Sequence, residues 1–288
     1  MTDLRAASAA LFCQLALTRL IREDPMIDLH CHLLPGIDDG AADLAESLAM
    51  ARTAVADGVT HLACTPHIYP GLYDNKGPDI IVAVARLQAE LDEAGVDLTL
   101  LSGADVQLAP DMVEGLRSGR LPSLADSRYF LFEPPHHVAP QRMNDVIFEL
   151  LAAGYVPVIT HPERLTWIEE RYETICEAFD AGAWIQLTGG AVTGMFGRRA
   201  RYWSERMLDE GRVHLIASDG HNMRRRRPVL SEAHEAAASR IGSDAALDLV
   251  LRRPQGVLLN RDPDEMPALA ARAPSRTRAS GWRRWFGG

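Results

Sequence analysis

Short apolar segments alternate with longer amphipathic segments along most of this chain. The apolar segments are rich in β-branched residues and have the length of buried strands. Seven of them can be distinguished, at 26–30, 60–64, 98–102, 129–132, 156–160, 183–187 and 213–217. Segments with the spacing of amphipathic helices separate most of these, for example at 43–56, 79–94, 141–153, 169–181 and 198–209.

This alternation predicts an α/β protein whose parallel strands are joined by right-handed helical crossovers. Several of the predicted helices end in Ala-Gly, Asp-Gly or Glu-Gly, the usual stop signal of a helix. Seven strand–helix units favour a closed or nearly closed β/α barrel over a doubly wound sheet. In such barrels the functional residues lie at the C-terminal ends of the strands.

Residue types that bind metals follow six of the seven predicted strands. They are His30, His32, His67, Asp105, Glu133, His161, Asp219 and His221. At the C-terminal end of the sixth predicted strand, the corresponding residues are Gln186 and Thr188. One such residue carries little information, but the agreement across the strands indicates a shared site.

His30 and His32 flank Cys31 at the end of the first predicted strand. Alternate residues of a strand point to the same face, so the two imidazoles lie together. Cys31 points to the opposite face, and we expect it to pack in the core.

Imidazole and carboxylate ligands without a thiolate cluster suit Mn, Fe, Zn, Co or Mg. The candidates outnumber the ligands that one ion needs, so the sequence predicts a cluster of two or three divalent ions. Such a cluster lowers the pKa of bound water and holds the oxygens of a phosphoryl group during its transfer. The candidate ligands are His30, His32, Asp39, His67, Asp105, His161, Asp219 and His221.

Four further assignments rest on local context. Asp39 precedes Gly40, and a turn or helix-cap role competes with ligation, although the two are compatible. For Glu133 we favour the role of an acceptor for a ligand histidine over direct ligation. His61 and His214 lie inside predicted strands, and we interpret both as structural.

Arginine candidates for phosphate binding lie near the predicted ligands. Arg164 follows His161 by three residues and could bind a phosphate through two nitrogens. Arg226 and Arg227 belong to a run that follows His221 closely, and we predict that they bind substrate. A solvated charged loop is the competing interpretation of that run.

Composition narrows the function classes. The 288-residue chain has a formal net charge of −9, which argues against a general nucleic-acid binder. No apolar run approaches the length of a membrane span. The four cysteines form no Cys-x-x-Cys pair, so we expect reduced thiols in a cytoplasmic protein. Cys13 and Arg19 have the spacing of a cysteine-phosphatase loop, but no glycine lies between them, and we treat the match as chance.

The chain divides into three parts. Residues 1–25 precede the first strand and are predicted to be an N-terminal extension that forms an amphipathic helix. Residues 26–262 form the predicted catalytic domain. Residues 263–288 are rich in Pro, Ala and Arg and are predicted to be a flexible tail that contains Trp282 and Trp285.

The motifs together resemble those of the bacterial manganese-dependent tyrosine phosphatases of the PHP (polymerase and histidinol phosphatase) superfamily. The resemblance begins at 26–40, the segment MIDLHCHLLPGIDDG, and runs to about residue 228 or 260. The later matching motifs are Thr65-Pro66-His67, Gly103-Ala104-Asp105, His161-Pro162-Glu163-Arg164, the segments 186–190 and 193–197, and 217–222.

This resemblance implies a distorted seven-stranded β/α barrel of PHP type with a trinuclear manganese site. It implies that His30, His32, Asp39, His67, His161, Asp219 and His221 bind metal and that Arg164 binds phosphate. Asp105 is a departure, since many members have a longer glutamate there. The extension before Met26 is a second departure.

We therefore predict a protein-tyrosine phosphatase with Arg164, Asp219 and His221 in catalytic roles and Mn²⁺ as its metal. Mg²⁺, Fe, Co²⁺ and Zn²⁺ are left open. The resemblance implies as partner a membrane-associated bacterial tyrosine kinase that controls capsule or exopolysaccharide synthesis. The expected location is cytoplasmic, with recruitment to the inner membrane by that partner and with homo-oligomerisation left open. The alternatives are a small-molecule phosphomonoesterase of the histidinol-phosphatase type and a non-catalytic binding protein.

Overall fold

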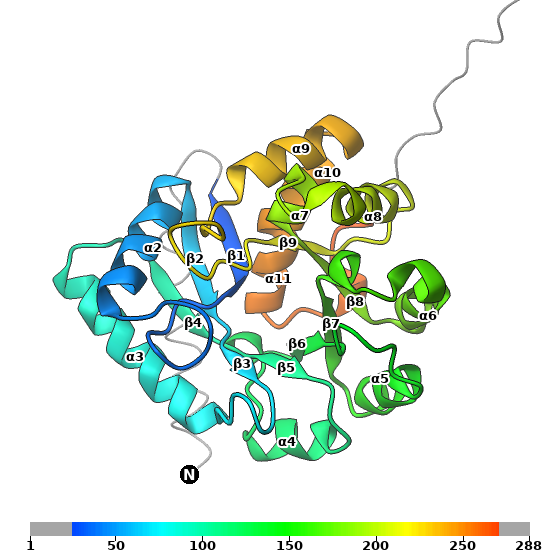
Figure 1. Ribbon diagram of the computed structural model, residues 1–288, viewed down its shortest axis with the longest axis horizontal. Helices are drawn as coiled ribbons and strands as arrows, with labels where there is room; N and C mark the ends of the chain where they lie inside the picture. The colour runs from blue at the N-terminus through cyan, green and yellow to red at the C-terminus, as the bar shows by residue number, and fades with distance from the viewer. Residues whose placement is uncertain (1–24, 271–288) are drawn as a thin grey trace, which may run out of the picture.

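The computed structural model describes residues 25–270, which form an α/β fold with parallel strands (Figure 1). Nine strands follow one another along this part of the chain. They are β1 (Met26–Cys31), β2 (Val59–Cys64), β3 (His67–Ile68), β4 (Thr99–Ser102), β5 (Asp105–Gln107), β6 (Tyr129–Glu133), β7 (Val156–Thr160), β8 (Trp184–Thr188) and β9 (Leu215–Ala217). The predicted α/β class with parallel strands is confirmed.

The strands form two sheets, with the orders β1-β2-β4 and β3-β5-β6-β7-β8-β9. The predicted strands at 60–64 and 98–102 correspond to β2 and β4, and each is followed by a further short strand, β3 or β5, in the other sheet. Pro66 separates β2 from β3, because proline has no N–H with which to continue a ladder. Gly103 and Ala104 separate β4 from β5, and a Cβ on Gly103 would lie only 3.0 Å from Leu124 and 3.1 Å from Thr65.

Main-chain bonds also join the first strand to the segment after the last one. The N–H of Asp219 donates to the carbonyl of His30, and the N–H of His32 donates to the carbonyl of Gly220, both at 2.8 Å. An isolated parallel bridge pairs Cys31 with Gly220. The two ends of the fold thus meet beside His30 and His32.

Helices lie around the outside of the strands (Figure 1). The longer ones are α2 (Leu44–Ala56), α3 (Gly77–Glu93), α5 (Met143–Ala152), α6 (Ile168–Ala181), α8 (Gly197–Asp209) and α9 (Ser231–Ile241). The shorter ones are α4 (Met112–Ser118), α7 (Gly189–Thr193), α10 (Ser243–Leu247) and α11 (Arg253–Leu258), with a π-helical turn at Asp248–Arg252 and 3₁₀ turns at Leu124–Asp126, Pro162–Arg164 and Pro263–Glu265. The helices predicted at 43–56, 79–94, 141–153, 169–181 and 198–209 are confirmed to within two residues at each end.

Helix α3 illustrates why these segments are helical. Its buried residues Ile80, Val84, Leu87 and Leu91 recur at intervals of three and four, so they form one apolar stripe. They belong to the large core between the strands and the outer helices. A second apolar cluster joins Leu29, Leu131, Val158 and Trp184 from four different strands.

The ends of the chain lie mostly beyond this description. The extension predicted at 1–25 falls almost wholly outside the described residues, as does most of the tail predicted at 263–288. In the described part of the tail, the buried Arg253 guanidinium donates to the carbonyls of Pro267 and Ala268. Within residues 25–270 no helix combines the length and the apolar composition that a membrane crossing needs.

Candidate metal centre

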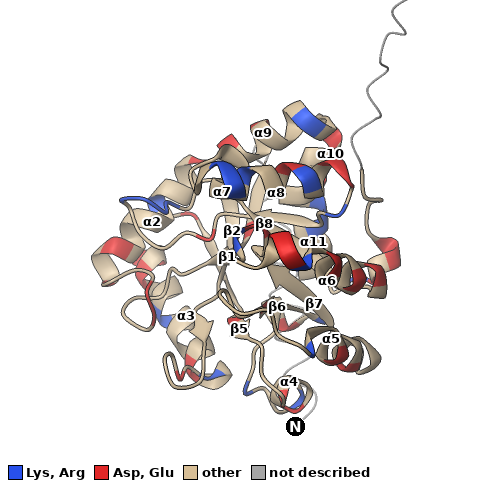
Figure 2. Cartoon of the chain, turned by 45° about the vertical axis from the view of Figure 1, so that its right-hand side comes forward, with Lys and Arg blue, Asp and Glu red and all other residues tan. Residues whose placement is uncertain are grey.

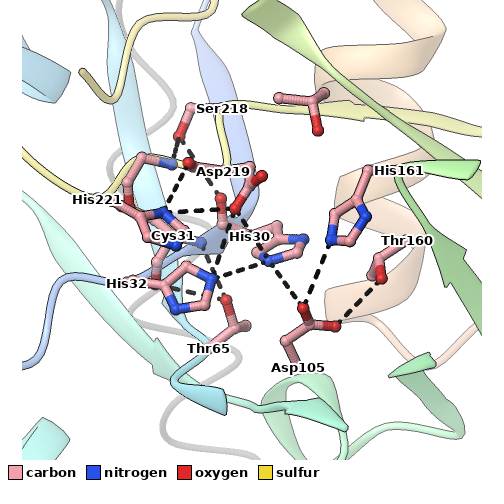
Figure 3. Close-up of polar contacts among 12 residues, drawn as sticks. His30, Cys31, His32, Thr65, Asp105, Thr160, His161, Ser218, Asp219 and His221 are labelled. Carbon is pink, nitrogen blue, oxygen red and sulfur yellow. Dashed lines mark hydrogen bonds and ion pairs between the residues drawn. The ribbon is translucent and has the colours of Figure 1, made fainter. Parts of the chain in front are cut away.

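The eight predicted ligands lie together near the C-terminal ends of the strands. Figure 3 shows His30, His32, Asp105, His161, Asp219 and His221 among them. Four overlapping groups bring their ligand atoms within 4.8 Å of one another. The groups are His32, Asp39, His67 and His221; His30, His32 and Asp219; His30, Asp105 and His161; and His67, Asp105 and Glu133. Each of the predicted residues belongs to at least one group.

His30 and His32 are oriented by partners behind them. Nδ1 of His30 donates to Oε1 of Gln186 at 2.8 Å, and Nδ1 of His32 donates to Oδ2 of Asp38 at 2.7 Å. Both Nε2 atoms therefore face the centre, 3.2 Å apart. Such hydrogen bonds fix the tautomer and the ring orientation of metal-binding histidines. Cys31, between them, is buried in the core as predicted.

Asp219 directs its two carboxylate oxygens to different partners. Its Oδ1 lies 3.5 Å from Nε2 of both His30 and His32, while its Oδ2 accepts from Arg164 and Arg226. Burial alone would raise the pKa of this carboxyl, but the adjacent Arg226 and His30 hold it well below its usual value. Asp219 is thus a buried anion that links the histidines to the arginines.

Asp105 is fully buried at the other side of His30. Its Oδ1 accepts from Oγ1 of Thr160 at 3.2 Å. Its Oδ2 lies 3.6 Å from a nitrogen of His30, His67 and His161, and it has no hydrogen-bond partner among the described residues.

The buried polar atoms without partners test whether these residues fit metal ions. Within the described residues they include Oδ2 of Asp105, Oδ1 of Asp219, Nδ1 of His67 and Nε2 of His221. Ligands about 2.0–2.2 Å from one ion lie roughly 3.0–3.6 Å from one another. The spacings of these atoms match that range, so the donor set fits divalent ions that favour nitrogen and oxygen ligands.

Glu133 and His67 contribute to the side of the centre formed by β3, β5 and β6. Oε2 of Glu133 lies 3.4 Å from Nδ1 of His67, and its Oε1 lies 3.8 Å from Nε2 of His161. The sequence favoured an accessory role for Glu133, but the structure puts its oxygens among the candidate ligand atoms. The other nitrogen of His67, Nε2, lies 3.5 Å from Asp39, so one ring faces two groups of ligands.

The loop after β1 contains both a predicted and an unpredicted carboxylate. Asp39 is 49% exposed, and its Oδ1 lies 3.5 Å from Nε2 of His221 as well as from His67. Asp38, which the sequence did not single out, accepts from His32, from the N–H of His67 and from the N–H of Gly40. A Cβ on Gly40 would lie 2.2 Å from the carbonyl oxygen of His32, so only glycine permits this turn.

Protonation differs sharply among the histidines. Burial lowers the pKa of His30 and of His161 to about 3, and that of His221 to about 4, so these rings are neutral and able to bind metal. Burial opposes protonation of His32 as well, but Asp219 and Asp38 outweigh it and raise its pKa to about 10. A metal that binds His32 must displace this proton.

Two of the three predicted arginines reach the centre. Arg164 and Arg226 both donate to Asp219, and their guanidinium carbons lie 4.6 Å and 5.9 Å from the ring centre of Phe196. Arg227 is exposed and forms no ion pair with Asp219, but it lines a surface cavity together with Arg226 and Phe196.

Backbone strain accompanies two candidate ligands. His161 and Asp219 have φ values of 38° and 52°, in the left-handed region that few residues other than glycine occupy. His161 directly follows β7, and Asp219 lies two residues after β9. At both places the chain turns sharply toward the centre. A single sequence gives no signal of such strain.

Asp28 and Glu163 are buried carboxylates that the sequence analysis did not assign. Asp28 accepts from the N–H and the hydroxyl of Ser218, and burial raises its pKa to about 6. Glu163 accepts from the N–H of Thr188 at 2.9 Å, and burial raises its pKa to about 7. For Asp28, the sequence signal of a special role was an acidic residue inside an otherwise apolar strand.

His61 and His214, the two histidines interpreted as structural, contact residues of the strands. Nδ1 of His214 accepts from the N–H of Ile185 at 3.0 Å, and its ring stacks on Trp184. His61 is buried within β2 and bonds to Thr60.

The chain is similar in sequence to known proteins. Residues 26–259 match the model of a family described as "Capsular polysaccharide synthesis, CpsB/CapC". The chain is 35% identical over 219 residues to the tyrosine-protein phosphatase YwqE of Bacillus subtilis, covering 76% of this chain and 86% of that protein. It is 29% identical over 245 residues to the tyrosine-protein phosphatase CpsB of Streptococcus pneumoniae, covering 82% of this chain and 99% of that protein.

A solved structure from a study of YwqE and CpsB, described there as unique metal-dependent tyrosine phosphatases, has a similar fold. Its TM-score is 0.80 at 31% sequence identity, and the match covers 86% of this chain and 100% of the other.

Proposed function

The chain belongs to the capsular polysaccharide synthesis family CpsB/CapC, and from this membership we propose that it is a metal-dependent protein-tyrosine phosphatase. The family resemblance drawn from the motifs is confirmed. The activity itself is carried over from relatives named as tyrosine-protein phosphatases, and from the similar fold of a solved structure described as a metal-dependent tyrosine phosphatase.

One observation supports this proposal above the others. Asp219 joins a cluster of metal-ligand side chains to two guanidinium groups. A metal site alone would serve many hydrolytic reactions. Arginines at the edge of such a site favour a phosphorylated substrate, because a guanidinium can bind two phosphoryl oxygens at once.

In the proposed reaction, Arg164 and Arg226 bind the phosphoryl group and stabilise the charge that it gains in the transition state. Binding requires them to exchange part of their contact with Asp219 for the phosphoryl oxygens. Phe196 keeps both guanidinium groups at the edge of the centre through stacking. None of the cysteines among the described residues takes part, since Cys31, Cys64 and Cys176 are all buried.

The residues proposed to hold the ions are His30, His32, Asp39, His67, Asp105, His161, Asp219 and His221, and we add Glu133. The chemistry supplied by bound divalent ions is the activation of water and the neutralisation of phosphoryl charge. Asp219 and His221 are proposed to be catalytic because they would hold the ions that supply this chemistry beside Arg164. We propose Mn²⁺, in two or three positions, since four ligand groups share residues and since the donors are nitrogen and oxygen.

We further propose that the two sheets act as one distorted seven-stranded barrel of PHP type. Support comes from counting β2 with β3 and β4 with β5 as single strands. Further support comes from the bonds of His30 with Asp219 and of His32 with Gly220, which link the first strand to the segment after the last. The proposed domain is 26–262.

The proposed partner is a membrane-associated bacterial tyrosine kinase that controls capsule or exopolysaccharide synthesis, because the family is described by its part in capsule synthesis. We propose a cytoplasmic location with recruitment to the inner membrane by that kinase. The free, buried cysteines suit a reducing compartment.

The test is hydrolysis of a phosphotyrosine peptide with Mn²⁺, measured beside a phosphoserine peptide of the same sequence and beside histidinol phosphate. We expect the phosphotyrosine peptide to be the best substrate by kcat/KM. A preference for histidinol phosphate would replace the proposal with the small-molecule alternative. Binding of the peptide without turnover, in a metal-loaded protein, would favour the non-catalytic alternative.

A further inference from the structure

The loop at 222–227 contains four consecutive arginines, Arg224 to Arg227, in a chain whose net charge is −9. The loop lies beside α2, where the N–H of Met223 donates to Glu46 (Figure 2). It begins one residue after His221, so it borders the metal centre. Its concentration of positive charge therefore lies close to the metal centre along the chain.

The four arginines differ in their partners. Arg226 turns inward and donates to Asp219. Arg224, Arg225 and Arg227 are exposed, and among the described residues none of the three side chains forms an ion pair. Other described arginines are paired with carboxylates, for example Arg201 with Glu205, Arg206 with Glu210 and Arg240 with Asp209. Three unpaired guanidinium groups on one short loop are thus available to an anionic partner.

The backbone of this loop is held in one shape. Oδ1 of Asn222 accepts from the N–H groups of Arg224, Arg225 and Arg226 at 3.0–3.4 Å. The carbonyl of Arg226 in turn accepts from the N–H groups of His221 and Asn222. The loop is therefore already ordered before a partner binds, and this order reduces the entropic cost of binding.

A cavity continues from this loop along the surface. Its lining includes Arg226, Arg227, Phe196, Met195 and Thr193. Met195 is 57% exposed. The cavity thus combines cationic and apolar walls, with one carboxylate, Glu232, also in its lining. It lies directly next to the guanidinium groups that we propose for phosphate binding.

Resting on the proposed function, we infer that this loop and cavity bind acidic residues that neighbour the phosphotyrosine of a protein substrate. Arg226 serves the phosphoryl group, and Arg224, Arg225 and Arg227 pair with carboxylates a few residues away along the substrate. The preferred substrate class is a phosphotyrosine in an acidic segment. A small phosphate monoester cannot span both places, so this surface distinguishes protein substrates from small ones.

The test compares two phosphotyrosine peptides of equal length, one with Glu and one with Gln on both sides of the phosphotyrosine. The wild-type protein should favour the Glu peptide in kcat/KM, chiefly through KM, and added salt should reduce the preference. In the double variant Arg224→Gln/Arg225→Gln the preference should fall by roughly fivefold, since exposed charge pairs contribute about two- to fivefold each. Arg224→Lys/Arg225→Lys should retain most of it.

Arg86→Gln is the matched control, because Arg86 is exposed on α3, which contributes no residue to the centre. It should leave the preference unchanged. Equal hydrolysis of both peptides by the wild-type protein would overturn the inference and leave the proposed function intact. Hydrolysis of neither peptide would overturn both.

A membrane surface is the competing partner for a basic loop. Binding is therefore also measured to phosphatidylcholine vesicles with and without phosphatidylserine. If the double variant lost vesicle binding but kept the full peptide preference, the loop would serve lipids and the inference would be wrong.

Discussion

The guanidinium group of Arg164 donates to Oδ2 of Asp219, the carboxylate whose Oδ1 faces His30 and His32. Arg164 therefore contacts a candidate metal ligand, Asp219, but is not itself a candidate ligand. This relationship separates binding of metal from binding of phosphate and makes the two testable apart.

Replacement of Arg164 by Ala should reduce kcat/KM for a phosphotyrosine peptide about 100-fold or more, the usual effect of losing a charged donor to the transition state. Metal content, measured by elemental analysis, should be mostly retained. Arg164→Lys should recover only part of the activity, since lysine cannot bind two oxygens as a planar fork. Loss of metal in proportion to activity would contradict this role.

Removal of metal should abolish turnover. Treatment with EDTA and the substitution His221→Ala should each reduce both bound metal and activity, because Nε2 of His221 faces Asp39 within a group of four candidate ligands. Cys13→Ala serves as the control and should remain active; Cys13 lies outside the described residues. Activity that survived EDTA but disappeared in Cys13→Ala would instead support a cysteine mechanism.

Gln186 should influence metal affinity without touching the metal. The substitution Gln186→Leu removes the acceptor of Nδ1 of His30 and should weaken metal binding roughly 10- to 100-fold, as loss of such partners does. Gln186→Glu keeps an acceptor at that position and should bind metal much more tightly than Gln186→Leu. Titration of the metal-free protein with Mn²⁺ measures both constants. Equal constants for the two variants would show that the hydrogen bond to His30 has no effect.

Gly190 should control the position of Phe196. A Cβ at position 190 would lie 2.8 Å from Cε2 of Phe196 and 3.3 Å from Sδ of Met195. Gly190→Ala should therefore displace the ring that stacks with Arg164 and lower kcat/KM. In a Phe196→Ala background the same substitution should add little, which a double-mutant cycle measures. Additive effects would mean that Gly190 acts through some other contact.

His214 should make stability depend on pH. Burial, assisted by the charge of Arg253, lowers its pKa to about 3, from 6.5 in the unfolded chain. Between these two values the unfolded state binds the proton more strongly, so stability should decrease as pH falls below about 6.5, by roughly 1 kcal/mol per pH unit. Above pH 6.5 His214 should have no such effect.

The variant His214→Asn isolates this contribution, since asparagine can still accept from Ile185 but does not titrate. Denaturant unfolding at about pH 7 and about pH 5 should show a smaller loss of stability in the variant than in the wild type. An identical loss in both proteins would assign the pH dependence to the histidines of the metal centre.

The sequence predicted which side chains lie together where each residue is at the end of a predicted strand or a few residues beyond it. His30, His32, His67, Asp105, His161, Asp219 and His221 are all so placed, and the rule for barrel strand ends brought them together. Asp38 was missed because its role depends on a turn that Gly40 permits, and a pair of aspartates does not reveal which one faces a histidine. Glu133 was assigned a lesser role because its distance to His67 is a tertiary property.

The two short strands β3 and β5 were not predicted from the sequence. The apolar runs at 60–64 and 98–102 are confirmed as β2 and β4, but β3 and β5 begin only after interruptions at Pro66 and Gly103. Those interruptions turn the chain so that His67 and Asp105 are paired neighbours in a second sheet. Periodicity describes a strand but not the place where it changes sheet.

The bonds that join the first strand to the segment after the last one have a consequence for how the protein is made. Asp28 and His30 are held by Ser218 and Asp219, which lie about 190 residues later in the chain. A ribosome must release both segments before the groups that contain Asp219 or His221 can form. The newly made chain therefore cannot assemble these ion sites early, and full loading with metal would report that synthesis and folding of the whole domain are complete.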